Sequence, residues 1–371
     1  MKRVLIVTII DYSNYGNRLQ NYALAEMLKS LSLNVTCGLE LFSKENADHL
    51  SGKWEQILKP VLPFCLYKVL SEVWRMSRPA IEREREHRFR NFSDQYLQML
   101  PRIYVNKSSE LEEKISLDYD YYIAGSDQIW NPYFAGADYQ FLTFAPSDKR
   151  IAFSASFGVK ELGQNEAKRY ARRLNDFAYI SVREQSGAGI VKKLTGKVAD
   201  VVLDPTLLLL QGEWERILKK PSLQLPKHYM LAFFLGEKPK TAIDRFSMQQ
   251  DIPVLYMNCK SYPDLYVLDP SEFLYMVKKA DYVLTDSFHG TVFSVKFNRE
   301  FYVFRRRQKG MENMFTRITD LLTRFGLEER IQEWDAVRKA PVVPDWQWQK
   351  ICAVLEEERE KTMKKLQELL I

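Results

Sequence analysis

A histidine in the second half of the chain has the surroundings expected of an acid–base group. Residues 281–298, DYVLTDSFHGTVFSVKFN, begin with a short apolar run typical of a buried strand, and Thr285, Asp286 and Ser287 then offer N-cap side chains. His289, followed by Gly290, therefore falls in the first turn of a predicted helix, at the sheet edge where α/β proteins bind ligands. Histidine is the side chain that ordinarily titrates near neutrality, so this position predicts proton transfer. The same spacing also fits a core histidine whose ring is satisfied by a neighbouring carbonyl.

Polar residues also follow two strands predicted in the first half. Residues 119–134 start as an aromatic-rich strand and reach Ser126 and Asp127, where Asp127 either closes an Asx-turn or faces a ligand crevice. The loop after the first strand holds Gly16 and Asn17, which can present a backbone donor and an amide to the same crevice. This loop lacks the G-x-G-x-x-G fingerprint, so no nicotinamide or flavin cofactor is predicted.

Strands alternate with helices along both halves of the chain, which predicts an α/β fold. The pattern is best satisfied by two Rossmann-like, doubly wound domains that face each other across a cleft. We place the first domain at residues 1–177 and the second at residues 178–340, and we expect the helix in residues 341–371 to pack back toward the first domain. A single sheet that continued through Ile180 would contradict this division.

Composition sets only broad limits on function. The 371 residues are 46% hydrophobic and 27% charged, as in an ordinary soluble globular protein, and the net charge of +6 suits acidic small molecules, an anionic membrane surface or nucleic acid. The four cysteines lie far apart, so neither a zinc site nor a disulfide framework is predicted. Residues 59–78 are amphipathic and fit either a helix that covers its own domain or one that lies on a bilayer.

With these elements placed, the chain resembles the polysaccharide pyruvyl transferase family, whose members have the two-Rossmann-domain arrangement of GT-B glycosyltransferases. The resemblance spans nearly the whole chain and rests on five short motifs, each at the end of a predicted strand. They are N-Y-G-N at 14–17, G-S-D-Q-I-W-N-P at 125–132, S-V-R-E-Q-S at 181–186, L-D-P-T at 203–206 and D-S-F-H-G at 286–290.

The resemblance implies a transferase that moves the pyruvyl group of phosphoenolpyruvate onto two hydroxyls of one sugar as a cyclic ketal. The acceptor would be a bacterial surface polysaccharide, such as an exopolysaccharide or capsule, or its lipid-linked oligosaccharide precursor. The implied setting is cytoplasmic, with peripheral contact to the inner face of the membrane. No cofactor, no metal ion and no nucleic acid partner is implied, because phosphoenolpyruvate itself is the donor substrate.

By the same resemblance, His289 matches the catalytic histidine of the family and Arg183 a basic residue that holds the anionic groups of the donor. A guanidinium can hold a carboxylate or phosphate through two parallel hydrogen bonds, which suits this role. The alternative for Arg183 is an ion pair between the domains. Asn17, Ser126, Asp127, Ser287, Gly290 and Lys296 are the further residues expected to bind substrate.

The chain departs from the family pattern at two places. Ser287-Phe288 precedes His289 where members often have Arg-Leu, so one expected cation for the donor is missing. Gly16-Asn17 stands where members often have Gly-Asp. Lys296, or one of the three arginines that follow the next strand, is predicted to replace the missing cation; these arginines are Arg305, Arg306 and Arg307.

Two other functions are compatible with these residues. One is a GT-B-type glycosyltransferase with a nucleotide-sugar donor, in which His289 supports a diphosphate leaving group. The other is a carbohydrate-binding relative without catalytic activity, for which the missing arginine would be the first sign.

Overall fold

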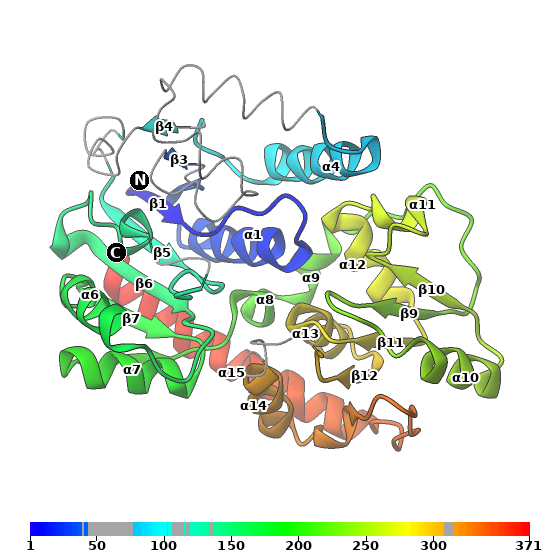
Figure 1. The fold of residues 1–371 in the computed structure, drawn as a ribbon. Coiled ribbons are helices and arrows are strands. Elements are labelled where there is room, and N and C mark those ends of the chain that lie inside the picture. The colour runs from blue at the N-terminus through cyan, green and yellow to red at the C-terminus, as the bar shows by residue number, and fades with distance from the viewer. Residues whose placement is uncertain are drawn as a thin grey trace.

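The computed structural model describes residues 1–38, 41–43, 77–101, 103–105, 115, 119–133, 137–307 and 315–371. Residues 59–76, most of the segment predicted to be amphipathic, lie outside these ranges. Within the described ranges, no helix is both long enough and apolar enough to cross a membrane. Figure 1 shows two α/β parts, with one long helix at the C-terminus that runs along both of them.

The first part is built on a parallel sheet of six strands in the order β2-β1-β5-β6-β7-β8. The inner strands form because their apolar residues are buried on both faces, as parallel sheets covered by helices require. A separate parallel pair, β3 and β4, lies outside this sheet. The strands are β1 (Arg3–Val7), β2 (Asn34–Cys37), β3 (Leu41–Ser43), β4 (Ile103–Val105), β5 (Tyr121–Gly125), β6 (Arg150–Ala155), β7 (Tyr179–Val182) and β8 (Asp200–Val201).

The helices of the first part connect these strands. Helix α1 begins at an Asn14 N-cap, whose side chain accepts a hydrogen bond from the backbone of Asn17, and nearly all of its first three turns are buried. The helices are α1 (Tyr15–Ser30), α4 (Ala80–Tyr96), α6 (Gln164–Asn175) and α7 (Gln185–Thr195), with the short 3-10 turns η3 (Asp138–Phe141) and η4 (Ser147–Lys149).

The predicted domain boundary at 177/178 is wrong, because β7 and β8 belong to the first sheet. Ala152 of β6 pairs with Ile180 of β7, and Val182 of β7 pairs with Val201 of β8. The sequence shows only that strands and helices keep alternating through this region. Which sheet the next strand joins depends on packing between distant segments, and here α6 and α7 cover the added strands.

The second part has a parallel sheet of five strands in the order β10-β9-β11-β12-β13. The strands are β9 (Met230–Phe233), β10 (Val254–Met257), β11 (Tyr282–Thr285), β12 (Glu300–Phe304) and β13 (Ile331–Gln332). The helices and turns after β8 are α8 (Pro205–Leu208), α9 (Gln211–Glu215), α10 (Lys240–Gln250), α11 (Pro263–Tyr266), α12 (Pro270–Lys279), α13 (Phe288–Lys296), α14 (Thr316–Phe325), η6 (Glu328–Arg330) and α15 (Asp345–Leu370).

The strand order reverses once in each sheet, between β1 and β5 in the first and between β9 and β11 in the second. In a doubly wound sheet the loops that leave such a pair of strands diverge to opposite faces and leave a crevice at their carboxyl ends. Each sheet therefore has one topological position where a ligand crevice is expected.

The two parts are packed together through an aromatic contact. Tyr15, at the start of α1, stacks on Phe273 of α12 with ring centroids 4.6 Å apart and meets Phe233 of β9 edge-on. The Tyr15 hydroxyl donates a hydrogen bond of 2.9 Å to the Leu268 carbonyl. A buried aromatic ring with a satisfied hydroxyl contributes favourably to an interface, so the domains are in direct contact at the loop after β1.

Helix α15 joins the second part back to the first. At its C-terminal end, the Ile371 carbonyl accepts a hydrogen bond of 3.2 Å from Lys2, and Lys365 lies 5.5 Å from the centroid of the Tyr179 ring. The two ends of the chain consequently lie side by side next to the first sheet (Figure 1).

Candidate functional site

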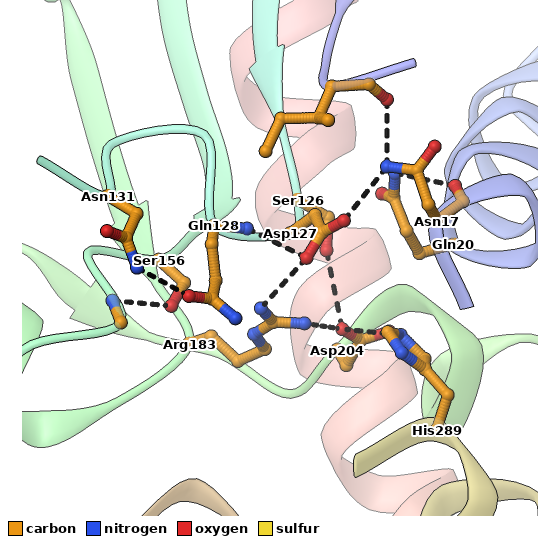
Figure 2. A network of polar contacts seen from close by, with 12 residues as sticks. Asn17, Gln20, Ser126, Asp127, Gln128, Asn131, Ser156, Arg183, Asp204 and His289 are labelled. Atoms are coloured by element: carbon orange, nitrogen blue, oxygen red, sulfur yellow. Dashed lines mark hydrogen bonds and ion pairs between the residues drawn. The ribbon is translucent and has the colours of Figure 1, made fainter. Parts of the chain in front are cut away.

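Polar residues from the switch points of both sheets meet in one buried cluster, shown in Figure 2. Asn17 follows β1 and Asp127 follows β5, so both come from the switch point of the first sheet. His289 follows β11, at the switch point of the second sheet. Arg183 and Asp204, which follow β7 and β8, lie between them. The structure thus brings together Asn17, Ser126, Asp127, Arg183 and His289, as the sequence predicted.

Asp204 is the centre of this cluster. Its carboxylate accepts hydrogen bonds from the Thr206 backbone at 2.9 Å and the Thr206 hydroxyl at 2.6 Å, and a long one of 3.5 Å from Ser126. It also forms an ion pair with Arg183, and its Oδ2 lies 3.8 Å from His289 Nε2. Burial acts to raise the pKa of Asp204, but the charge of Arg183, together with the hydrogen bonds from Thr206, outweighs it and lowers that pKa. Asp204 is thus held as an anion.

Sequence reasoning assigned no role to Asp204, although it lies in the L-D-P-T motif. The available signal was Asp204 before a proline, a pattern that predicts a helix N-cap. Asp204 does cap α8, with Pro205 in the first turn. The same carboxylate that begins the helix also binds Arg183.

Arg183 is held on one side and has unused donors on the other. Its side chain is 3% exposed, and its Nη2 lies 3.8 Å from Asp127 Oδ1, which is too far for a hydrogen bond. Among the described residues, Arg183 Nε and Nη2 have no hydrogen-bond partner. The ion pair with Asp204 fixes the guanidinium, while two of its nitrogens remain able to donate to a ligand.

Asp127 and Asn17 bind each other. The Asn17 amide donates to Asp127 Oδ2 and to the Ile9 carbonyl, both at 2.9 Å, and Asn17 is fully buried. Asp127 has a φ of 68°, in the left-handed region that Asp tolerates better than most residues. An aspartate at position 17 would put a second carboxylate against Asp127, so the departure from Gly-Asp to Gly-Asn suits the charge of this site.

His289 is enclosed between the two domains. It is 8% exposed, and a Cβ placed on Gly16 would lie 1.9 Å from His289 Nδ1, so only a glycine allows this approach. Its Nε2 has no hydrogen-bond partner among the described residues. Burial lowers the pKa of His289, while Asp204 and Asp127 partly offset that effect. The imidazole therefore favours its neutral form until negative charge arrives nearby.

Ser287 and Gly290 shape the start of α13. The Ser287 hydroxyl accepts a hydrogen bond of 3.3 Å from the Gly290 backbone N–H, which makes Ser287 the N-cap. A Cβ on Gly290 would lie 2.5 Å from Thr285 Oγ1, so the glycine lets the helix start close to β11. In this structure Ser287 and Gly290 position His289. Their contacts within the chain explain why these two residue types stand here, and no contact with a ligand is needed.

The cations predicted to replace the missing arginine are engaged elsewhere. Lys296 donates a hydrogen bond of 2.8 Å to the Leu207 carbonyl at the end of α8, and burial lowers its pKa to about 8. Arg306 donates to Asp286 at 2.9 Å. The other two lie against aromatic rings, Arg305 on Phe315 and Arg307 on Trp334. The prediction for Lys296 is wrong, because its ammonium is bound at the Leu207 carbonyl and not in the cluster around His289.

Arg317 is a cation near the site that sequence reasoning missed. It lies in the first turn of α14 and is 8% exposed, and its guanidinium is 5.3 Å from the centroid of the Phe288 ring. The guanidinium of Arg183 is 5.1 Å from the same ring. Arg317 follows His289 by 28 positions and lies in no motif.

Among the described residues, no group of three His, Cys, Asp or Glu side chains is placed to hold a metal ion.

Two parallel α/β sheets, whose switch-point loops contribute to one shared polar cluster, define a two-domain, Rossmann-like protein. The chain belongs to the polysaccharide pyruvyl transferase family, whose family profile matches residues 14–307, and it is accordingly a transferase. A search of curated protein sequences finds no match.

Solved structures with a similar arrangement share little sequence with this chain. MnaA of S. aureus, solved with UDP, has a TM-score of 0.43 at 12% identity, over 95% of this chain and 95% of that chain. MurG of Acinetobacter baumannii has a TM-score of 0.43 at 10% identity, over 100% and 99%. The UDP-GlcNAc 2-epimerase of Neisseria meningitidis, bound to UDP-GlcNAc, has a TM-score of 0.41 at 10% identity, over 97% and 100%.

Proposed function

We propose that this chain transfers the pyruvyl group of phosphoenolpyruvate to a sugar of a bacterial surface polysaccharide or its lipid-linked precursor, and forms a cyclic ketal. The observation that supports this most is the buried His289, whose Nε2 is unpartnered among the described residues, next to Asp204 and Arg183. A buried group that titrates, beside a cation with unused donors, suits a substrate that must be protonated and that carries negative charge.

The reaction is an addition followed by a substitution. The His289 imidazolium gives a proton to the methylene carbon of phosphoenolpyruvate, and the electron pair of the double bond forms the new C–H bond. The first sugar hydroxyl attacks the resulting oxocarbenium carbon and returns its proton to the imidazole. The second hydroxyl then attacks that carbon, the bond to the phosphate oxygen breaks, and the phosphate leaves with the second proton.

The protonation state of His289 follows from its surroundings. The N-terminus of α13 and burial both oppose a positive imidazolium. The phosphate and carboxylate of the donor have the opposite effect, because they place negative charge near the ring. His289 then becomes an acid when the donor is bound, and the empty site keeps it neutral.

Ligand binding tests the proposed donor directly. Phosphoenolpyruvate is expected to raise the melting temperature by mass action, whereas UDP-sugars and neutral sugars alone should leave it nearly unchanged. Incubation with phosphoenolpyruvate and galactose- or N-acetylhexosamine-containing acceptors should release phosphate and give a pyruvylated product detectable by mass spectrometry. Stabilisation by a nucleotide sugar and none by phosphoenolpyruvate would replace the proposal with a glycosyltransferase. A response to sugars alone would indicate a carbohydrate-binding relative.

His289 is expected to take up a proton when the donor binds. The pKa of this histidine is lowered in the free protein by burial and rises when the anionic donor binds. Affinity for phosphoenolpyruvate should therefore fall as the pH rises through the window between these two pKa values. Calorimetry in two buffers of different ionisation enthalpy measures the number of protons taken up on binding. The same measurement with His289→Gln gives the part of this uptake that comes from titration of the donor phosphate. Equal uptake by the two proteins would contradict this expectation.

A further inference from the structure

We propose that Arg317 is the second cation of the donor site, where it holds the phosphate or carboxylate of the donor together with Arg183. This inference rests on the proposed function and specifies how the anionic substrate is bound. It assigns to α14 the charge that is absent beside His289, where Ser287 and Phe288 stand. Arg317 also lies beyond the segment matched by the family profile, which ends at residue 307.

The two arginines approach the ring of Phe288 from different domains. The guanidinium of Arg183 comes from the loop after β7 and that of Arg317 from α14, yet they lie 5.1 Å and 5.3 Å from the centroid of one ring, Phe288. The Phe288 ring lies 5.3 Å from the His289 ring, so both cations contact the ring that adjoins the histidine. An anion bound by both would span the domains at the point where His289 enters the cluster.

Arg317 is buried without the partners that a buried guanidinium requires. Its Nε has no hydrogen-bond partner among the described residues, although the whole residue is only 8% exposed. Burial, and next the charge of Arg183, lower the pKa of Arg317 to about 10. Two guanidiniums that repel each other in a buried place are stabilised by an anion between them, since the anion supplies both the charge and the acceptors.

The nearby carboxylates do not take the place of that anion. Asp127, Asp204 and Glu184 attract Arg317 electrostatically, but within the described part of the chain none of them lies within the 4.0 Å of an ion pair with it. Each accepts hydrogen bonds from neutral donors: Asp204 from Thr206 and Ser126, Asp127 from Asn17 and Gln128, and Oε1 of Glu184 from Ser156 and Phe157. The other oxygen of Glu184, Oε2, has no partner among the described residues. The free donor atoms of Arg183 and Arg317 are therefore available to a ligand.

Replacing Arg317 separates a binding role from a structural one. Arg317→Met keeps an unbranched apolar side chain at this position and removes a buried, unsatisfied charge, a change that is often neutral or stabilising. Calorimetry should show that it weakens phosphoenolpyruvate binding at least tenfold, while the melting temperature of the free protein stays the same or rises. Arg317→Lys, which keeps a charge but loses the bidentate geometry, should give an intermediate affinity. Arg324→Gln on the same helix, where Arg324 pairs with Glu358 near the surface, is the matched control and should bind normally.

Titration with inorganic phosphate separates this inference from the proposed function. Wild-type affinity for phosphoenolpyruvate in both Arg317 variants would overturn the role of Arg317 and leave the pyruvyl transfer proposal in place. If the wild type binds phosphate but not phosphoenolpyruvate, and Arg317→Met binds neither, the donor proposal fails and the anion site stands. If the wild type binds neither anion, both fail. Should Arg317→Met unfold, a structural role is indicated, unless the folded Arg317→Lys variant shows the weakened binding.

Discussion

Replacement of His289 by glutamine is expected to reduce pyruvyl transfer by about 10²- to 10⁴-fold, the range typical of a positioned acid–base group. Glutamine retains a hydrogen-bond donor of similar reach but cannot carry a proton to carbon. Affinity for phosphoenolpyruvate should change far less, because Arg183 and the backbone of the site remain. The effect should thus appear mainly in kcat, and the dissociation constant should change only by the part that proton uptake at His289 contributes.

The experiment compares wild type and His289→Gln by calorimetry with phosphoenolpyruvate and by phosphate release with an accepted sugar. His228 provides a matched control, since it lies near the surface, 3.0 Å from Asp281 and away from the cluster. His228→Gln should leave turnover unchanged. If His289→Gln turned over as fast as the wild type, His289 would have no part in the proton transfer. A parallel fall in affinity and turnover would mean instead that the ring holds the phosphate.

A single methyl group at position 16 is expected to be almost as damaging. In Gly16→Ala, the added Cβ would lie 1.9 Å from His289 Nδ1, so the imidazole has to rotate away or α1 has to move. A displacement of about 1 Å at a catalytic group can cost on the order of 10²-fold in rate. We expect that loss in turnover, with the free energy of unfolding less affected, because the histidine can leave the contact more easily than the core can be repacked.

Gly189→Ala is the matched control for this substitution. Gly189 is exposed on α7, and a Cβ there would meet nothing within 4 Å. Alanine is the better helix former, by up to about 1 kcal/mol, so Gly189→Ala should be as stable as the wild type or slightly more stable, with normal turnover. A fully active Gly16→Ala protein would show that the close contact between the domains is not required for catalysis. Chemical unfolding of all three proteins separates the two effects.

The parts of the site that carry local signals could be predicted from the sequence. Asp127 and His289 each follow an apolar run that ends in turn or N-cap residues, and the carboxyl ends of parallel strands fix the edge on which they lie. The alternating pattern likewise predicted two parallel sheets. These features depend on a few neighbouring residues, which is why a single sequence is sufficient to find them.

The predictions that failed concern features that depend on how distant elements pack. Lys296 follows His289 by seven positions, a helical spacing that puts both on one side of α13, yet the Leu207 carbonyl of α8 binds it. Arg317 reaches Phe288 only because α14 packs against α13. The strand that contains Ile180 joined the first sheet for the same kind of reason. No periodicity within one helix or strand indicates which other element covers it.

The close contact between Gly16 and His289 has an evolutionary consequence. A lineage that acquires any side chain at position 16 displaces the imidazole. Selection for transferase activity therefore has to keep Gly16 and His289 together. Once the histidine is lost, position 16 is free to drift, and the two positions are expected to change together among related sequences. A homologue with a bulky residue at the position of Gly16 is therefore predicted to have abandoned this chemistry, even where its fold is intact.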